Sequence, residues 1–150
     1  MKTYNTDSQD HEKLTPHGQV TFTIQDKNII IYHARGPFNV ELFKTFEVLQ
    51  SNILKEIDKE TKSWVDLIIF EESCMATKEL FLEFTSYLKS MKSNNLIPLI
   101  SAYVFKDGVE GSHIIPGEIQ KCYQDANMNY GAFNNEEEAM AHIKTYLPKK

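Results

Sequence analysis

The chain of 150 residues is long enough for one folded domain, and its 41% of hydrophobic residues exclude a disordered segment. Its net charge is −5 and Arg35 is the only arginine among 16 basic residues, which argues against nucleic-acid binding. Two cysteines are too few for a disulfide scaffold, and no apolar run approaches the ~20 residues of a membrane span, so we expect a cytoplasmic protein without a transmembrane segment.

The first part of the chain predicts a tail, a hairpin and a helix. Residues 1–17 are polar and without periodicity, and predict a flexible N-terminal tail. Residues 20–25 alternate apolar and polar side chains, and a short turn joins them to the apolar run 29–34, so the two strands form a hairpin. An amphipathic helix is predicted from the N-cap Asn39 to about Glu60.

The rest of the chain alternates strands with helices. The predicted elements are a strand at 63–70 buried on both faces, a helix capped by Thr77, a strand at 96–105, a helix at 116–126, a strand at 130–133 and a helix capped by Asn135. This order predicts an α/β fold in one domain, residues 18–150, with a mixed, mostly parallel open sheet of about five strands and four helices. Only the strand at 20–25 should run antiparallel, and it should form a sheet edge.

Three stretches carry a resemblance to a known family: "GPFNVELFKTFEVL", "WVDLIIF" and "YGAFNNEEEAMAHIKTYL". In their order the chain resembles the STAS domains, and in particular the SpoIIAA-like (STAS/SEC14-like) group of small bacterial proteins, over about residues 18–147. The resemblance implies a non-enzymatic binding or regulatory module. Related antagonists of anti-sigma factors are phosphorylated on a serine after the third strand. Here that turn reads "EESCMATKE", which places Ser73 nearby but lacks the family motif.

The stretch "ARGPFNVELF", residues 34–43, has the layout of a phosphate-binding loop but not its chemistry. It contains one glycine, Pro37 removes a backbone donor, and Glu41 would repel an anion. We therefore predict no nucleotide and no other cofactor. Instead the loop should turn the chain and anchor the helix through Phe38, which occupies a hydrophobic-staple position together with Phe43.

The remaining reactive side chains form no catalytic pattern. The five histidines lack ligand spacing, which predicts no metal site. Cys74 precedes a helix, and we interpret it as a small buried residue rather than a nucleophile. Glu71 and Glu72 are adjacent in a strand and point in opposite directions, so Arg35 should form a structural ion pair with one of them. We predict no catalytic residue and no enzymatic activity.

The carboxyl ends of the strands are the predicted ligand or partner edge, because open α/β sheets bind ligands there. The residues predicted at this edge are Arg35, Gly36, Phe38, Phe70, Glu71, Met75, Phe105, Val109 and His113. Apolar side chains with a few polar ones suit a small ligand or a peptide. The alternative is that these loops only close off the core.

Two functions follow as hypotheses. The first is a regulatory module that acts through a protein partner, and the second is a carrier of a small apolar, lipid-like ligand at the predicted edge. A homodimer or partner surface is also predicted, either from the free edge of the strand at 20–25 or from a helix patch of Val40, Phe43 and Leu54.

Overall fold

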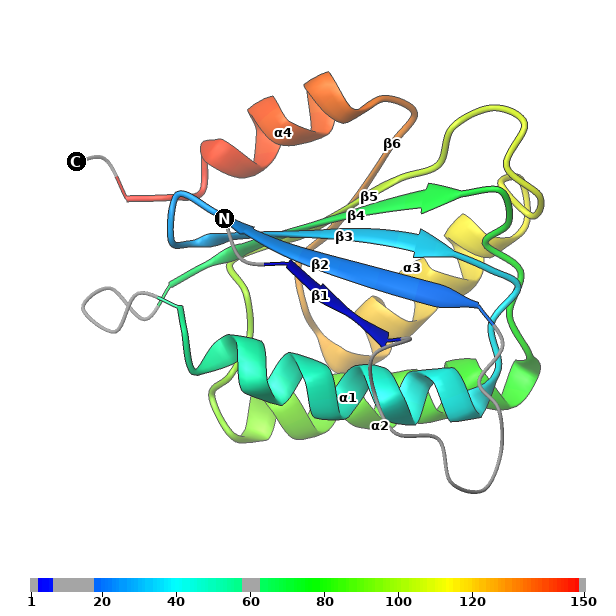
Figure 1. The fold of residues 1–150 in the computed structure, drawn as a ribbon, viewed down its shortest axis with the longest axis horizontal. Coiled ribbons are helices and arrows are strands. Elements are labelled where there is room, and N and C mark those ends of the chain that lie inside the picture. The colour runs from blue at the N-terminus through cyan, green and yellow to red at the C-terminus, as the bar shows by residue number, and fades with distance from the viewer. Residues whose placement is uncertain (1–2, 7–17, 58–62, 149–150) are drawn as a thin grey trace.

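The computed structural model describes residues 3–6, 18–57 and 63–148 (Figure 1). It contains one sheet whose strands follow the chain order across the sheet. These strands are β1 (Thr3–Asn5), β2 (Gln19–Gln25), β3 (Ile29–Arg35), β4 (Val65–Glu71), β5 (Ser101–Val104) and β6 (Tyr130–Phe133). β2 is antiparallel to both of its neighbours, and every other pair is parallel, so β2 alone runs against the rest, as predicted.

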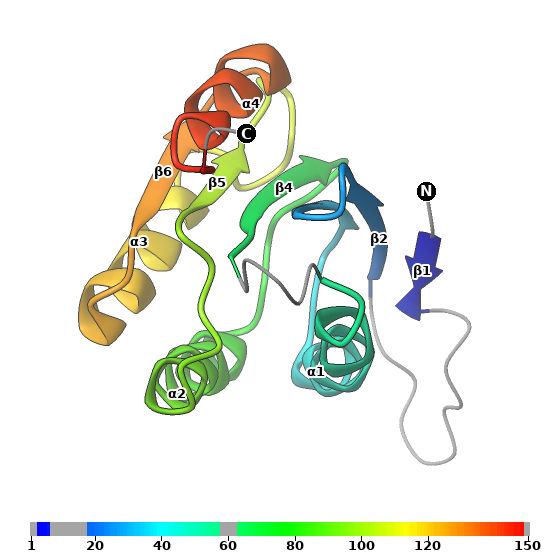
Figure 2. The ribbon, with the colours of Figure 1, turned by 90° about the vertical axis from the view of Figure 1, so that its left-hand side faces the viewer.

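Four helices pack on the two faces of this sheet. They are α1 (Val40–Leu54), α2 (Lys78–Ser93), α3 (Ile115–Ala126) and α4 (Glu136–Lys144). Figure 2 shows α1, α2 and α3 on one face and α4 on the other. None of the helices within the described residues has the length and apolar character that a membrane crossing requires.

β4 lies in the middle of the sheet and is buried along its length up to Phe70, as its apolar sequence predicted. Its side chains alternate between two separate cores. Ile68 and Phe70 belong to the core under α1–α3, whereas Leu67 and Ile69 belong to the smaller core under α4. Helices on both faces therefore explain why this strand has no polar face.

Side-chain caps begin three of the helices at the predicted positions. The Asn39 side chain accepts a hydrogen bond from Leu42 N at 3.0 Å, and Asn135 accepts one from Glu138 N at 2.8 Å. Thr77 plays the same role for α2. Each cap satisfies a backbone N–H that has no partner inside the helix, which fixes where the helix starts.

The observed elements differ from the predicted ones in three places. β1 lies inside the segment predicted to be a tail and pairs with β2, so β2 is not an edge of the sheet and the strand count is six. α1 ends at Leu54, and the predicted end near Glu60 lies outside the described residues. β5 pairs over four residues only, so the predicted strand at 96–105 is longer than the observed one, mainly at its start.

Candidate functional site

Two residues of the predicted edge, Arg35 and Glu71, form an ion-pair cluster with His33 and Glu72 where β3 and β4 end. Arg35 Nη2 lies 3.1 Å from Glu71 Oε2, and Arg35 Nε lies 3.6 Å from Glu72 Oε1. His33 Nδ1 lies 2.9 Å from Glu71 Oε1. The hydrogen bonds from His33 and then Arg35 hold the pKa of Glu71 below its ordinary value. The predicted ion pair of Arg35 is therefore present, and it links neighbouring strands.

The apolar members of the edge are core residues. Phe38, Phe70, Phe105 and Val109 are between 7% and 9% exposed. The Phe70 ring packs against the rings of both Phe38 and Phe105, with centroid distances of 5.9 Å and 5.4 Å. These side chains fill the end of the sheet and leave little apolar surface there for a ligand.

Backbone hydrogen bonds join the loops at this edge. Gly36 N donates to Ser73 O and Phe38 N donates to Met75 O, both at 2.8 Å. A Cβ on Gly36 would lie 2.7 Å from Ser73 O, so only glycine permits this approach. Ser73 is 5% exposed and donates its hydroxyl to Glu110 at 2.8 Å.

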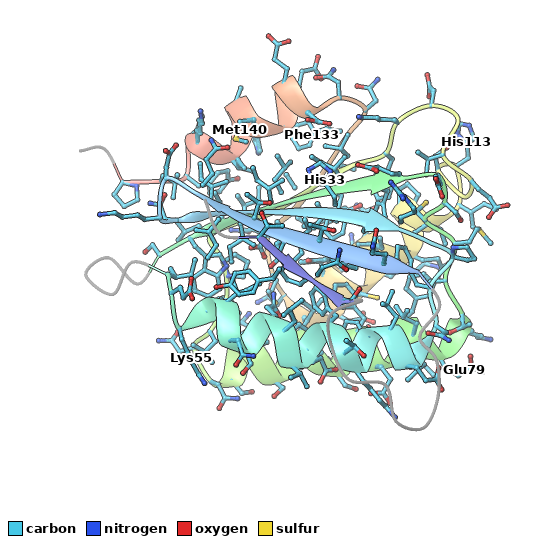
Figure 3. The ribbon with its side chains drawn as sticks, viewed as in Figure 1. His33, Lys55, Glu79, His113, Phe133 and Met140 are labelled. Atoms are coloured by element: carbon cyan, nitrogen blue, oxygen red, sulfur yellow. The ribbon has the colours of Figure 1, made fainter. Side chains whose placement is uncertain are left out.

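The other residues predicted at this edge do not converge on one site. Met75 packs beside Gly111, where an added Cβ would meet its sulfur at 2.8 Å. His113 is exposed in the loop before α3 and lies apart from His33 (Figure 3). Cys74 is buried, and burial raises the pKa of its thiol to about 11, which suits the predicted structural role better than a nucleophile. The geometry at this edge agrees best with the alternative that the loops close off the core.

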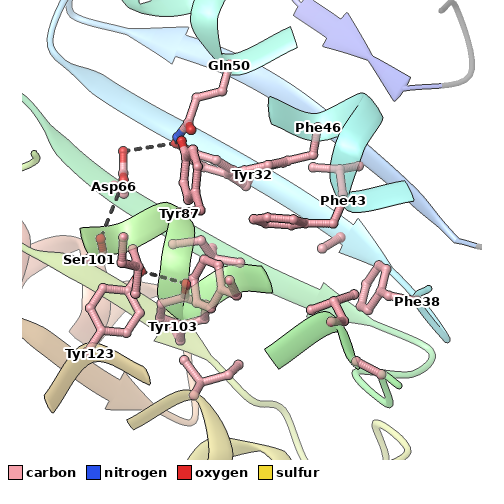
Figure 4. Close-up of a pocket in the computed structure, with 18 of the residues that line it drawn as sticks. Tyr32, Phe38, Phe43, Phe46, Gln50, Asp66, Tyr87, Ser101, Tyr103 and Tyr123 are labelled. Atoms are coloured by element: carbon pink, nitrogen blue, oxygen red, sulfur yellow. Dashed lines mark hydrogen bonds between the residues drawn. The ribbon is translucent and has the colours of Figure 1, made fainter. Parts of the chain in front are cut away.

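A cavity of about 130 Å³ lies between the sheet and helices α1–α3 (Figure 4). Phe38 and Phe70 reach it from the predicted edge, but its main walls come from the interior of the fold. Aromatic rings of α1 and α2 pack against each other in its wall: the Phe43 centroid lies 5.6 Å from that of Phe84 and 5.4 Å from that of Tyr87, both edge-to-face. The predicted surface patch is therefore wrong for Phe43, which is 7% exposed.

One end of the cavity is polar. Gln50 of α1 donates to the Tyr32 hydroxyl at 2.9 Å, and Tyr32 donates to Asp66 Oδ1 at 3.2 Å. Ser101 of β5 donates to Asp66 Oδ2 at 3.4 Å. The chain of hydrogen bonds thus runs from α1 through β3 and β4 to β5, and Figure 4 shows it at one side of the aromatic walls.

Two buried polar atoms beside this chain lack a partner among the described residues. They are Gln50 Oε1 and Trp64 Nε1, on side chains that line the cavity and are 6% and 5% exposed. The Trp64 indole lies close enough to lower the pKa of Asp66 but does not reach it with hydrogen-bond geometry. A buried acceptor and a buried donor are therefore both available to a bound molecule.

Burial dominates the electrostatics of Asp66. It raises the pKa of this carboxyl from 3.8 to about 7, against the opposing effect of hydrogen bonds from Tyr32 and Ser101 and of the nearby Trp64 indole. Asp66 is thus a partly ionised acid at neutral pH in a mostly apolar cavity. Among the described residues, no group of three or more His, Cys, Asp or Glu side chains is arranged to hold a metal ion.

The sequence interpretation did not identify this site. A usable signal was present, because Asp66 is the only charged residue between Trp64 and Phe70 in an otherwise apolar run. Comparisons of the chain with protein families, with curated proteins and with solved structures gave no match. Function is therefore inferred from the geometry of the cavity.

Proposed function

We propose that the chain binds a small, largely apolar molecule in the cavity between the sheet and helices α1–α3. The observation that supports this most is the combination of aromatic walls with unpartnered polar atoms at one end. Ligand sites in proteins have this composition, with apolar walls for affinity and a few polar groups for orientation. This is the ligand-carrier hypothesis, with the site moved from the strand ends into the fold.

The size of the cavity limits the ligand. A volume of about 130 Å³ is close to that of engineered apolar cavities of about 150 Å³ that bind benzene. It lies below the ~300–1,000 Å³ of pockets for drug-sized molecules. The ligand that fits is therefore about one aromatic ring in size, rather than a long-chain lipid.

Regulation through a protein partner, the STAS-like assignment and a homodimer stay predictions. Two of the predicted features that favoured association are absent from the described residues, because Phe43 is buried between α1 and α2 and β2 is paired on both sides. Val40 and Leu54 remain partly exposed. The cavity is the more specific feature, so ligand binding is the function that the geometry favours.

Thermal unfolding with toluene as the probe tests the proposed function. A molecule that binds only the folded chain stabilises it more as its free concentration rises above its Kd, so Tm should increase as toluene is added. Chemical-shift changes in the amide spectrum should be concentrated on residues of α1, α2 and β3 that surround the cavity.

Ala34→Leu is the matching variant, because Ala34 lines the cavity and is 4% exposed, so a larger side chain fills the space. Toluene should then raise Tm by much less than in the parent chain. Ala141→Leu, at an exposed position of α4, is the control of equal size change. A parent chain that does not respond to toluene, or an Ala34→Leu chain that responds equally, would contradict the proposal.

A further inference from the structure

The polar end of the cavity contains a buried carboxyl group that no cation neutralises within the described residues. Asp66 is 6% exposed, and hydrogen bonds alone support it, with no lysine, arginine or histidine paired to it. The ionisable side chains facing it are tyrosines from four elements: Tyr32 of β3, Tyr87 of α2, Tyr103 of β5 and Tyr123 of α3. Burial raises the pKa of each, so all four are neutral near pH 7, and Gln50 of α1 is uncharged.

Buried carboxylates are normally paired with a cation, because an unpaired charge loses its hydration without compensation. Folding has already removed most of the water from Asp66. A ligand that brings a positive group therefore meets a carboxylate whose desolvation was completed before binding, and it loses only its own hydration. An anionic ligand would instead add a second negative charge to the same apolar space.

Resting on the proposed function, we propose that the ligand of this cavity is an apolar amine of about one aromatic ring in size. Its ammonium group would pair with the Asp66 carboxylate and donate to Gln50 Oε1, the acceptor that has no partner among the described residues. The ring would lie among the aromatic walls of α1 and α2, whose faces also attract cations. An ammonium has three donors and no acceptor, so it suits the carboxylate and amide oxygens of this end, and it leaves Trp64 Nε1, the unpartnered donor, beside Asp66.

Calorimetric titration with three probes of one ring each tests this assignment. Benzylamine, benzyl alcohol and benzoate have the same ring and differ in the charge of the polar group. At pH 8 we expect benzylamine to bind about tenfold or more tightly than benzyl alcohol, because a charge-assisted hydrogen bond is stronger than a neutral one. Benzoate should bind more weakly than either.

Asp66→Asn removes the negative charge and keeps the shape of the side chain. Its affinity for benzylamine should fall tenfold or more, to that for benzyl alcohol or below it, because the ammonium loses its counter-charge, while benzyl alcohol binds as before. Unchanged benzyl alcohol binding shows that the cavity is intact. Glu71→Gln is the control, since it removes a carboxylate at the strand ends outside the cavity and should not alter either affinity.

The parent chain provides a second readout that needs no variant. Asp66 is mostly protonated at pH 6 and mostly ionised at pH 8, so benzylamine, which stays protonated over this range, should bind about tenfold more tightly at pH 8. Benzyl alcohol should show no such change. If neither probe nor toluene binds, the proposed function itself fails. If benzyl alcohol binds as well as benzylamine at pH 8, the cavity is a ligand site but the amine assignment is wrong.

Discussion

Asp66 connects the stability of the chain to pH. Its pKa in the folded state is about 7, against 3.8 ordinarily, so between these values the folded state holds a proton that the unfolded state has lost. Stability contributed by this group is therefore greatest below about pH 4, decreases as pH rises towards 7 and is constant above. Most buried carboxylates with cation partners behave in the opposite way, because their pKa is lowered.

Asp66→Asn should accordingly stabilise the fold more at pH 8 than at pH 5. The difference in gain between the two conditions should be about 2–3 kcal/mol, because asparagine has no proton to lose. Urea unfolding at both pH values measures it. Equal gains at pH 5 and pH 8 would show that Asp66 titrates normally in the folded chain.

Phe38 is the second residue whose substitution we expect to change the free energy of unfolding measurably. It is 9% exposed, its ring packs on Phe70, and a Cβ at Gly18 would touch it at 2.7 Å. Phe38→Ala should lower the free energy of unfolding by about 3 kcal/mol through lost burial and the space left behind. Urea unfolding of the variant measures this, and a loss below about 1 kcal/mol would mean that the surrounding loops collapse onto the gap.

Nucleotides should leave the melting temperature of the parent chain unchanged, because the loop at Gly36 and Pro37 is occupied by backbone hydrogen bonds to the Ser73–Met75 turn. A thermal scan with ATP or GTP at millimolar concentration is the check. An increase in Tm with either nucleotide would restore the phosphate-loop interpretation.

Among the elements, α4 depends most clearly on its cap. Asn135 accepts from Glu138 N at 2.8 Å, and three glutamates occupy the first turn, where negative charge is favourable. Asn135→Ala should cost about 1 kcal/mol of stability, while Asn134→Ala, one residue earlier, should cost less. Chemical unfolding of both variants makes the comparison, and equal losses would mean that the cap bond does not define the helix start.

Helix caps and the alternation of apolar and polar side chains made most of the elements predictable. Two features that were predicted wrongly, the end of α1 and the strand β1, have physical explanations. The apolar period of α1 continues to Ile57, yet the helix ends at Leu54. Ile57 is buried all the same, because a residue in the turn after a helix can also reach the core. β1 has three residues and no periodicity of its own, and it exists because β2 offers an open edge. Neither effect is visible in a local pattern.

At the scale of the whole molecule, the strand ends were predictable and the cavity was not. Parallel order is enough to bring Arg35 and Glu71 together, since their strands are neighbours in register. The cavity instead depends on the distance between α1 and α2 and on residues of the sheet and of three helices, so no single motif records it. Only Asp66, a charged residue inside a buried strand, indicated that the interior had a polar feature.

β1 should also protect the whole molecule from self-association. It covers β2, and Thr6, which is 1% exposed, accepts from Val20 N at 3.0 Å. A chain that lacks residues 1–6 would leave an unpaired strand edge, and such edges pair with other chains. Sedimentation velocity should show more dimer or larger species for this truncation than for the full chain at equal concentration. Identical profiles would mean that β2 does not need cover.

Trp64 is the single tryptophan of the chain, and it lies in the wall of the cavity at 5% exposure. Indole emission responds to the polarity around the ring and to nearby quenching groups, and here one of those neighbours is a carboxyl that changes charge near pH 7. The chain therefore contains its own fluorescent reporter. Its emission should follow both the occupancy of the cavity and the ionisation of Asp66 without any added label, so that screening many small molecules needs only the unmodified protein.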